Sequence, residues 1–286
     1  MEGAGYDVVG DLHGHAGQLH RLLAKLGYLK DSSGESYLHP DGRQVIFLGD
    51  FINRGPEVDE VLRLAQAMHQ SGSALAVLGN HEFGVFTRMA SGRADCPPEC
   101  FPYVDWLRTL PLALEVGGLR VVHAAWHRKS LEVVGGRNCE DEEFVRLAGT
   151  KGTPEHKATK ILLRGVKVPL PTDKVYRDRF GIPRDRGRIR WWLDPEGVSY
   201  AGLIFPACEG LPEDYGPKSS DLKGVEPYPV EEPPVFLGHY CLPPAEPKVM
   251  GNVACVDGCV TCDKVLWAYR YDGERTLSAA RLASSS

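Results

Sequence analysis

Five short motifs hold the side chains of this sequence that could do chemistry: GDLHGH (10–15), GDFINRG (49–55), GNHE (79–82), HAAWH (123–127) and GHYC (238–241). Their polar residues offer carboxylate, imidazole and amide donors: Asp11, His13, Asp50, Asn80, His123 and His239. A single residue of this kind is more often structural than functional. Six such residues, placed in five motifs that follow one another along the chain, form a specific signal. These donors suit a pair of borderline divalent ions such as Mn²⁺, Fe²⁺ or Zn²⁺ better than a structural zinc site. Two ions about 3.5–4 Å apart can hold the attacking and leaving oxygens of a displacement at phosphorus.

The motifs must be positioned by the short apolar runs that precede them, at 6–9, 44–49, 74–79, 119–124 and 235–239. Between the early runs, apolar residues recur at helical spacing over 19–26 and 58–68. This alternation predicts a layered α/β fold with much parallel sheet. Ligands of such sheets bind outside the carboxyl ends of the strands, so we expect the motifs to converge on one site. Glycines at the turns would let the backbone bend sharply: Gly10, Gly49, Gly79 and Gly238.

The second half of the chain is organised differently. Residues 127–234 are rich in proline, glycine and charge, which favours a long insertion or cap rather than a domain with its own large core. Strand-like segments return at 235–239, 252–257 and 265–271, enough to complete a second sheet. We therefore predict a single domain over 1–286 that contains the insertion 127–234.

Composition excludes several classes of protein. The 286 residues are 43% hydrophobic and 25% charged, as in ordinary globular domains and unlike disordered chains. Because no apolar run approaches the length of a membrane span, we expect no membrane partner. The first ten residues lack the pattern of a signal peptide, which predicts a cytoplasmic protein whose eight cysteines are reduced thiols.

The net charge of −5 is unevenly distributed. Residues 146–190 contain 13 basic and 4 acidic residues, whereas 209–232 contain 7 acidic and 2 basic ones. The basic block suggests an anionic partner or substrate, and the acidic block could cover it. Within the basic block, Arg188 and Arg190 alternate with Ile189 and predict a strand with one basic face. That face either lies in solvent or meets substrate anions.

Taken as an ordered set, GDLHGH, GDFINRG, GNHE, VVHA and GHYC resemble the calcineurin-like metallophosphoesterases. The similarity is greatest to the branch of Ser/Thr protein phosphatases and bacterial symmetrical diadenosine tetraphosphatases. It implies a two-sheet sandwich flanked by helices, and it does not cover 127–234. The resemblance implies that Asp11, His13 and Asp50 hold the first metal, with Asp50 bridging. It assigns Asn80, His123 and His239 to the second metal. It also implies that His81 is the general acid and that Arg54 grips the phosphoryl oxygens.

Two positions depart from the family pattern. Where the family has GDxxDRG, this chain has Asn53, which can orient His81 but brings no charge to stabilise its protonated form. Asp257 is a candidate for a replacement carboxylate. Where many relatives have GHxH, this chain has Cys241, for which we favour a free thiol over a metal ligand. The cysteines of CxxxCxxC (255–262) do not have the matched spacing of zinc sites, so we expect ordinary thiols there too.

The sequence thus predicts a dimetal-dependent hydrolase of phosphate esters, with Mn favoured and Fe or Zn as alternatives. Its substrate would be a phosphoprotein or a phosphorylated small molecule, with phosphoprotein phosphatase-like or broad phosphomonoesterase action. The alternative is symmetrical hydrolysis of dinucleoside tetraphosphates. A hypothesis of another class is a metal- or nucleotide-binding module with little turnover. Nucleic acid is disfavoured as a substrate because no nucleic-acid-binding module is present, and the sequence does not define the oligomeric state.

Overall fold

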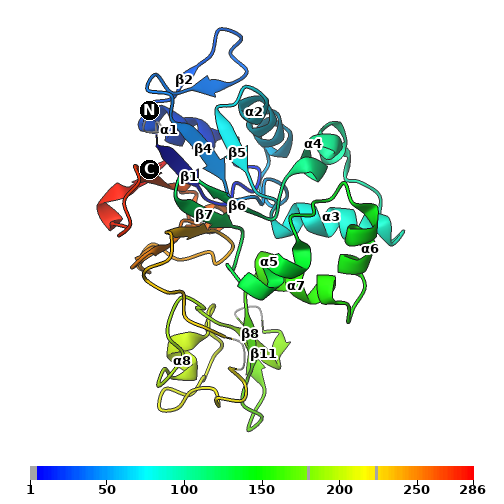
Figure 1. The fold of residues 1–286 in the computed structure, drawn as a ribbon, viewed down its shortest axis with the longest axis vertical. Coiled ribbons are helices and arrows are strands. Elements are labelled where there is room, and N and C mark those ends of the chain that lie inside the picture. The colour runs from blue at the N-terminus through cyan, green and yellow to red at the C-terminus, as the bar shows by residue number, and fades with distance from the viewer. Residues whose placement is uncertain (1–4, 179–180, 223–224) are drawn as a thin grey trace. The chain divides into compact units, whose positions relative to one another are not determined.

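The structure, a computed structural model, describes residues 5–178, 181–222 and 225–286. These residues form two compact units (Figure 1). The first consists of the described chain up to Leu163 together with Pro233–Ser286, and the second is Arg164–Glu232. All five motifs lie in the first unit, which therefore contains the candidate site.

The first of two five-stranded sheets has the N-terminal strand at its centre. Its strands, in spatial order, are β16 (Leu282–Ser284), β15 (Trp267–Tyr271), β1 (Tyr6–Val9), β4 (Gln44–Phe47) and β5 (Ala74–Ala76). β1, β4 and β5 run parallel, so the motifs that follow them leave from one edge. β15 pairs antiparallel with β1. The prediction that 265–271 completes the second sheet is therefore wrong. Its alternating pattern fits either sheet, and β1 needs a partner on its free side to satisfy its backbone groups.

The second sheet consists of β13 (Val249–Met250), β14 (Val253–Cys255), β12 (Val235–Leu237), β7 (Leu119–Val122) and β6 (Ala113–Val116). β12 lies between β7 and β14 and is parallel to both. The chain therefore leaves β7, β12 and β14 in the same direction. The backbone N–H of Gly238 donates to the carbonyl of His123 at 2.9 Å, which ties two of the motifs together.

The two sheets pack face to face through a buried core. Val8 and Ile46 from the first sheet share one hydrophobic cluster with Val121 and Phe236 from the second. The ring of Phe236 also lies 5.1 Å from that of Tyr269. Burying one such side chain contributes about 1.5–3 kcal/mol. The predicted α/β class and the two-sheet sandwich are thus confirmed.

Helices flank this sandwich: α1 (Ala16–Leu26), α2 (Val58–Gln70), α3 (Asn80–Ala90), α4 (Val104–Thr109), α5 (Arg128–Val134), α6 (Glu142–Gly149), α7 (Pro154–Arg164) and α9 (Val260–Asp263). Smaller elements are the pair β2 (Leu29–Lys30) and β3 (Tyr37–Leu38) and the 3₁₀ turns η1 (Pro98–Tyr103) and η2 (Ala279–Arg281). In α1 the leucines at helical spacing are buried, as predicted, and Gly27 ends the helix in the left-handed conformation. None of the helices in the described ranges is long and apolar enough to cross a membrane.

The second unit contains short elements around a small core. β8 (Lys167–Pro169) pairs with β11 (Arg186–Arg188), β9 (Tyr176–Arg177) pairs with β10 (Pro183–Arg184), and α8 is Tyr200–Leu203. The predicted segment 127–234 crosses the boundary between the units, because α5, α6 and most of α7 belong to the first. Its role as an insertion or cap stays a prediction.

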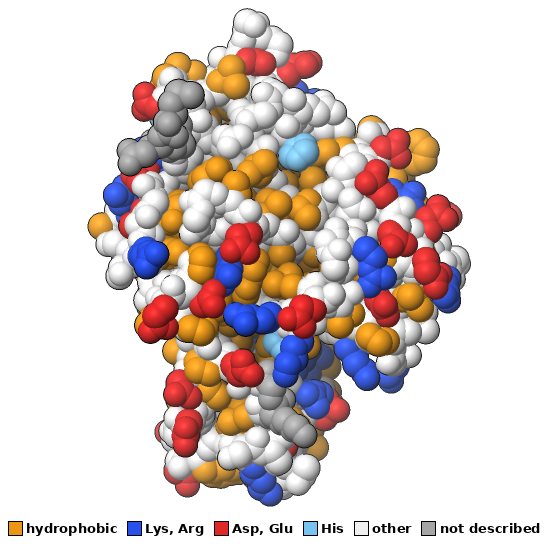
Figure 2. Space-filling model, in the orientation of Figure 1, with side chains coloured by type: hydrophobic (Ala, Val, Ile, Leu, Met, Phe, Trp, Pro, Cys, Tyr) orange, Lys and Arg blue, Asp and Glu red, His pale blue; other side chains and the backbone are white. Residues whose placement is uncertain are grey.

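Charged side chains are intermingled on the face seen in Figure 2. Within the basic block, Arg146 pairs with Glu143 at 2.6 Å and Arg184 pairs with Asp178 at 2.5 Å. Part of the positive charge of 146–190 is thus balanced by neighbouring carboxylates.

Candidate metal centre

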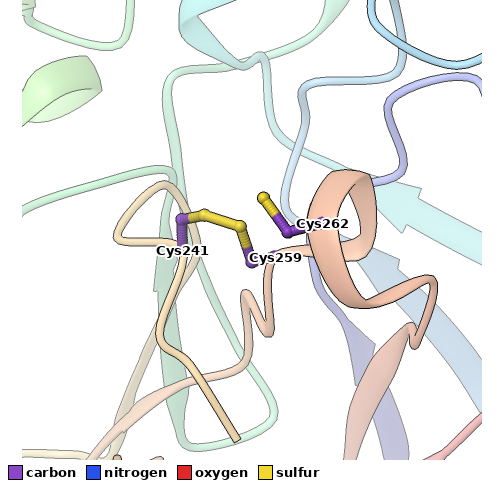
Figure 3. A group of neighbouring side chains, drawn as sticks. All are labelled: Cys241, Cys259 and Cys262. Atoms are coloured by element: carbon purple, nitrogen blue, oxygen red, sulfur yellow. A yellow bond between two sulfur atoms is a disulfide. The ribbon is translucent and has the colours of Figure 1, made fainter. Parts of the chain in front are cut away.

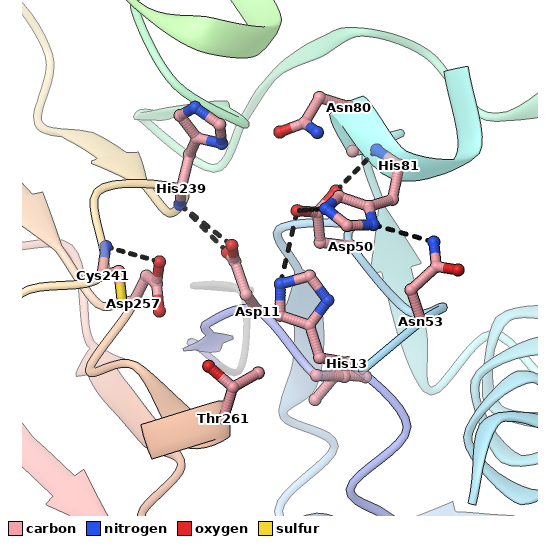
Figure 4. A network of polar contacts seen from close by, with 12 residues as sticks. Asp11, His13, Asp50, Asn53, Asn80, His81, His239, Cys241, Asp257 and Thr261 are labelled. Carbon is pink, nitrogen blue, oxygen red and sulfur yellow. Dashed lines mark hydrogen bonds and ion pairs between the residues drawn. The ribbon is translucent and has the colours of Figure 1, made fainter. Parts of the chain in front are cut away.

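The five motifs meet at one edge of the sandwich (Figure 4). The predicted ligands leave the ends of β1, β4, β5, β7 and β12: Asp11, His13, Asp50, Asn80, His123 and His239. Five of the six are buried, and His239 is half-buried. Parallel pairing aligns the strand ends within each sheet, and the contact between Asp11 and His239 then joins the two sheets across 228 positions of sequence.

Asp50 lies at the centre of this group. Three imidazole nitrogens face its Oδ2 atom: Nε2 of His13 at 3.6 Å, of His123 at 3.5 Å and of His81 at 3.9 Å. Its Oδ1 atom accepts a hydrogen bond from the backbone N–H of His81 at 2.9 Å. Two sets of potential ligands therefore share Asp50: His13–Asp50–His81 and Asp50–His123–His239, each with its ligand atoms within 4.8 Å of one another.

Backbone carbonyls define which imidazole nitrogens carry a proton. Nδ1 of His13 lies 3.0 Å from the carbonyl oxygen of Ile52, and Nδ1 of His123 lies 2.7 Å from that of Leu48. A carbonyl only accepts, so each Nδ1 must donate, and in the neutral ring Nε2 keeps a lone pair. In that neutral form both lone pairs face the Oδ2 atom of Asp50. A positive charge between them relieves this repulsion: without a metal a proton on Nε2 of His123 supplies it, and a bound metal ion would take its place, so these residues fit a metal ion.

Ionisation at the centre follows the same logic. Burial lowers the pKa of His123, but the charges of Asp50 and Asp11 outweigh burial and raise that pKa to about 10. Burial raises the pKa of Asp50, yet the positive charges of His123, His81 and His13 hold that pKa well below its usual range. Both shifts show that the centre attracts positive charge.

Asp11 follows β1 of the first sheet and contacts the loop after β12 of the second sheet. Both of its carboxylate oxygens accept the backbone N–H of His239, each at 3.1 Å. Burial and the nearby charge of Asp257 raise the pKa of Asp11. A Cβ at Gly238 would collide with Oδ1 of Asp11, so glycine is needed there for close approach rather than for a positive φ. Asn80 completes the group, with its Oδ1 atom 3.2 Å from Nε2 of His123.

Backbone strain concentrates at this edge. Six non-glycine residues of the motifs have a positive φ: His13, Asp50, Asn53, Arg54, His239 and Cys241. The remaining ones in the described part of the chain lie next to α9, at Cys259 and Lys264. Such conformations cost about 1–3 kcal/mol each and persist where the surrounding structure imposes them, which is typical of functional sites.

Asn53 contacts His81, the residue that the resemblance implies as the general acid. The Nδ2 atom of Asn53 lies 2.8 Å from Nδ1 of His81. Burial lowers the pKa of His81 to about 4, although the charge of Asp50 opposes this. Arg54 is exposed, and its positive charge contributes to lowering the pKa of both His81 and His13. It therefore lies within electrostatic reach of the centre.

Sequence reasoning missed Glu82, the last residue of GNHE. Its carboxylate accepts backbone N–H groups from Asp50, Ile52 and Gly79, each at 3.1 Å. It is fully buried, and burial together with the charge of Asp50 raises its pKa to about 7. The available signal was an acidic residue in the first turn of a helix, where a carboxylate can reach back to free N–H groups. Glu82 thus joins the GDFINRG and GNHE loops.

Asp257 and the cysteines differ from expectation. The backbone N–H groups of Cys241 and Cys259 donate to Asp257 at 2.6 and 2.9 Å. The Asp257 carboxylate thus holds these two loops together, and its charge raises the pKa of Asp11. It does not replace the aspartate that the family has at position 53. A disulfide joins Cys241 to Cys259, and the expectation of eight reduced thiols is wrong for these two. The chain leaves the adjacent parallel strands β12 and β14 side by side, which brings together cysteines 18 residues apart. Motif spacing alone did not reveal this.

The two arginines predicted to contact substrate belong to the second unit. β11 ends at Arg188, and Ile189 forms an isolated bridge with Ile204, so the predicted strand is shorter than expected. Nε of Arg188 donates to the carbonyl of Phe205 at 3.2 Å, and the guanidinium of Arg190 lies 5.1 Å from the ring of Phe205. Their part in substrate binding stays a prediction.

A family model described as calcineurin-like phosphoesterase matches residues 6–200, which include all the motifs except GHYC. The chain belongs to this family. Calcineurin-like phosphoesterases use a dinuclear divalent metal centre and act on phosphorylated small molecules or phosphoproteins. The two ligand sets that share Asp50 fit such a centre.

Two curated relatives illustrate the similarity within the calcineurin-like phosphoesterases. Bis(5′-nucleosyl)-tetraphosphatase PrpE (asymmetrical) of Halalkalibacterium halodurans is 45% identical over 76 residues, which are 27% of this chain and 30% of that protein. The symmetrical bis(5′-nucleosyl)-tetraphosphatase of Ralstonia nicotianae is 32% identical over 126 residues, which are 41% of this chain and 40% of that protein. The chain therefore matches less than half the length of either relative.

Among solved structures, a cold-active protein-tyrosine phosphatase from a psychrophilic Shewanella species aligns with 98% of this chain, and the alignment includes 80% of the phosphatase chain. It is 16% identical, with a TM-score of 0.49.

Proposed function

We propose that the protein is a metal-dependent hydrolase of phosphate esters. The observation that carries this proposal is the arrangement around Asp50, whose Oδ2 atom faces three Nε2 atoms at 3.5–3.9 Å. Membership in the calcineurin-like phosphoesterases supports the same reaction class.

The two metal ions would be held by six residues of the motifs. Asp11, His13 and Asp50 would hold one ion, and Asn80, His123 and His239 would hold the other together with Asp50. This assignment differs from the group His13–Asp50–His81 by having Asp11 in the place of His81. Manganese is the favoured ion, since imidazole, carboxylate and amide oxygen ligands suit it and no thiolate is among them. When bound, the ions activate water and offset the negative charge of the phosphoryl group.

Other residues of this chain would act on the substrate and the leaving group. Arg54 is exposed beside the centre and would bind the non-bridging phosphoryl oxygens through its planar guanidinium. His81 would face the leaving oxygen, with its Nδ1 side held by Asn53 at 2.8 Å. Glu82 would keep Asp50 in place by fixing its backbone N–H.

The contact between Asn53 and His81 favours a second candidate substrate class, the dinucleoside polyphosphates. With its N–H₂ group turned toward His81, as here, the amide only donates, so Nδ1 is unprotonated and the contact does not stabilise the imidazolium. A neutral imidazole is a poor proton donor, which penalises alkoxide leaving groups most. A nucleoside phosphate leaves without needing a proton from the enzyme. The two curated relatives, both bis(5′-nucleosyl)-tetraphosphatases, support this candidate.

The test is a substrate panel on purified full-length protein, with and without Mn²⁺. The panel contains p-nitrophenyl phosphate, a phosphoserine peptide and diadenosine tetraphosphate. Mn²⁺-dependent turnover of any of them supports the proposed reaction class, and the ranking of the peptide against the dinucleotide separates the two candidates. Stoichiometric metal binding without turnover of any member would instead indicate a binding module. We also propose that the protein is cytoplasmic and that its partner is its substrate, a phosphorylated small molecule or a phosphoprotein.

A further inference from the structure

Three cysteine sulfurs gather at one place (Figure 3), and one of them, that of Cys241, lies beside the candidate metal centre but outside its predicted ligands (Figure 4). Cys241 lies in the loop after β12, Cys259 just before α9 and Cys262 within α9. All three sulfurs lie within 4.8 Å of one another. We call these residues the thiol cluster. Cys259 is buried, Cys241 is half-buried and Cys262 is exposed, so the cluster opens to solvent on one side.

The backbone holds the thiol cluster independently of its disulfide. Asp257 accepts the N–H groups of Cys241 and Cys259, and its own carbonyl accepts the N–H of Leu242 at 2.9 Å. The N–H of Cys262 donates to the carbonyl of Cys259 at 2.8 Å. Because these bonds involve no sulfur, they hold the backbone of the three residues in place when the bond between Cys241 and Cys259 is broken, and the two sulfurs then move apart to a non-bonded distance.

Not every cysteine nearby belongs to this cluster. Cys255 lies in β14, fully buried, and its sulfur faces the carbonyl of Gly238 at 3.6 Å. The set that converges is therefore Cys241, Cys259 and Cys262 and not the three cysteines of the CxxxCxxC stretch. The loop after β12 supplies Cys241, and the segment around α9 supplies Cys259 and Cys262. Many ligand sites are likewise assembled from separate loops, whereas a disulfide needs only two cysteines.

The surroundings of the thiol cluster are suited to thiolates. The hydroxyl of Thr261 lies 3.9 Å from the sulfurs of both Cys259 and Cys262. The ammonium group of Lys264 donates to the carbonyl of Thr261 at 2.9 Å, which places a positive charge on the same short helical turn. Both features offset part of the negative charge that converging thiolates would create, to which the nearby carboxylate of Asp257 adds.

We propose that the reduced thiol cluster binds a thiophilic divalent ion, Zn²⁺ being the natural occupant. Three thiolates are soft ligands and select Zn²⁺ over the ions preferred by oxygen ligands, which separates this site from the phosphoesterase centre. The exposed side leaves a fourth position for water. The disulfide is the metal-free, oxidised state, since it removes two of the three ligands. A phosphine reductant breaks the sulfur–sulfur bond and takes an oxygen atom from water, whose two hydrogens protonate the two sulfurs. Metal binding then releases thiol protons to solvent.

The experiment uses the full chain, stripped of metal and studied without oxygen in oxidised and phosphine-reduced forms. Denatured samples should titrate six thiols in the oxidised form and eight in the reduced form. Co²⁺ is the probe, because thiolate ligands give it an intense charge-transfer absorption that the nitrogen and oxygen ligands of the phosphoesterase centre do not give. Zn²⁺ added afterwards should abolish the band by displacing Co²⁺.

Two variants provide the comparison. Cys262→Ser removes one exposed ligand and leaves the disulfide intact, whereas Cys96→Ser removes a half-buried free thiol outside the cluster. We expect the band in reduced wild type and reduced Cys96→Ser, and none in oxidised wild type. In reduced Cys262→Ser, the affinity of the thiolate site for Co²⁺ should fall at least as much as the roughly 10–100-fold that the loss of an outer-shell partner typically costs. Absence of the band from reduced wild type, or wild-type affinity in Cys262→Ser, overturns the proposal. Neither result bears on phosphoesterase activity.

Discussion

The side-chain nitrogen of Asn53 lies 2.8 Å from Nδ1 of His81, on the side of the ring away from Asp50. A donor in this position holds the ring in one orientation but does not stabilise its protonated form. With burial lowering the pKa of His81 to about 4, the imidazole is neutral over most of the physiological range. This contact links one departure from the family pattern to the pH dependence of the reaction.

Replacing Asn53 by aspartate should extend activity to higher pH. A carboxylate at this position favours the imidazolium and raises the pKa of His81 by about 1–3 units. A general acid works only while protonated, so the alkaline limb of the pH profile of kcat/KM should move upward. Alkyl phosphates should gain more than p-nitrophenyl phosphate, whose leaving group needs little protonation. The measurement is kcat/KM against pH for both substrates and both proteins. An unchanged limb would show that His81 is not the proton donor.

Asp50→Asn should abolish activity while the fold persists. An amide cannot bridge two cations as a carboxylate does, and the three surrounding imidazoles lose their common negative partner. We expect kcat to fall by far more than tenfold, a factor that corresponds to about 1.4 kcal/mol. Metal content is measured alongside kcat, and circular dichroism reports on the fold. A variant that keeps two metals and more than about a tenth of the wild-type kcat contradicts the bridging role.

Glu82→Gln should weaken both the fold and the reaction. The carboxylate accepts three backbone N–H groups, and an amide nitrogen in place of one oxygen leaves a buried donor facing another donor. Such a conflict costs about 1–3 kcal/mol. Urea unfolding of the metal-free protein measures this cost. Glu99→Gln, at an exposed position, is the matched control and should stay within about 0.5 kcal/mol of wild type. Equal stability of the two variants would remove Glu82 from its positioning role.

Neutralising Arg188 and Arg190 together should act on KM more than on kcat. If the second unit binds substrate anions, a double change to glutamine weakens polyphosphate substrates much more than p-nitrophenyl phosphate. Arg188 and Arg190 are half-buried, and their attraction for substrate anions that reach them from solvent should shrink as salt rises, because such charge interactions are screened over about 8–10 Å at 0.10–0.15 M ionic strength. Equal losses on both substrates, or an effect independent of salt, would place these arginines outside substrate binding. In that case their contacts with Phe205 are their main role.

The sequence predicted the placement of polar motifs at strand ends because two local signals coincide there. Apolar runs of four to six residues mark β1 and β4, and a glycine followed by a charged or amide residue marks each exit. Convergence then follows from parallel pairing, which requires no knowledge of side-chain contacts. This is why Asp11, Asp50 and Asn80 could be named together in advance.

Contacts between segments distant in the sequence could not be predicted in the same way. β15 has the alternating pattern of a strand, but nothing local assigns it to β1 rather than to the second sheet. The disulfide depends on the loops after β12 and β14 lying side by side, and spacing along the chain does not encode that. Glu82 was missed because its role is toward backbone N–H groups of another motif.

The discontinuity of the first unit has a consequence for how the protein is made. β1 stays without its antiparallel partner until Trp267–Tyr271 has been synthesised, and His239 follows Asp11 by more than 200 residues. Contacts this distant in sequence close slowly, because the entropy of the intervening loop opposes them. On the ribosome, β1 therefore has no hydrogen-bonding partner on the side away from β4 while the second unit is translated. Packing of α1 and α2 against the N-terminal strands would limit their exposure during that interval, and the complete metal centre can form only after His239 has been synthesised.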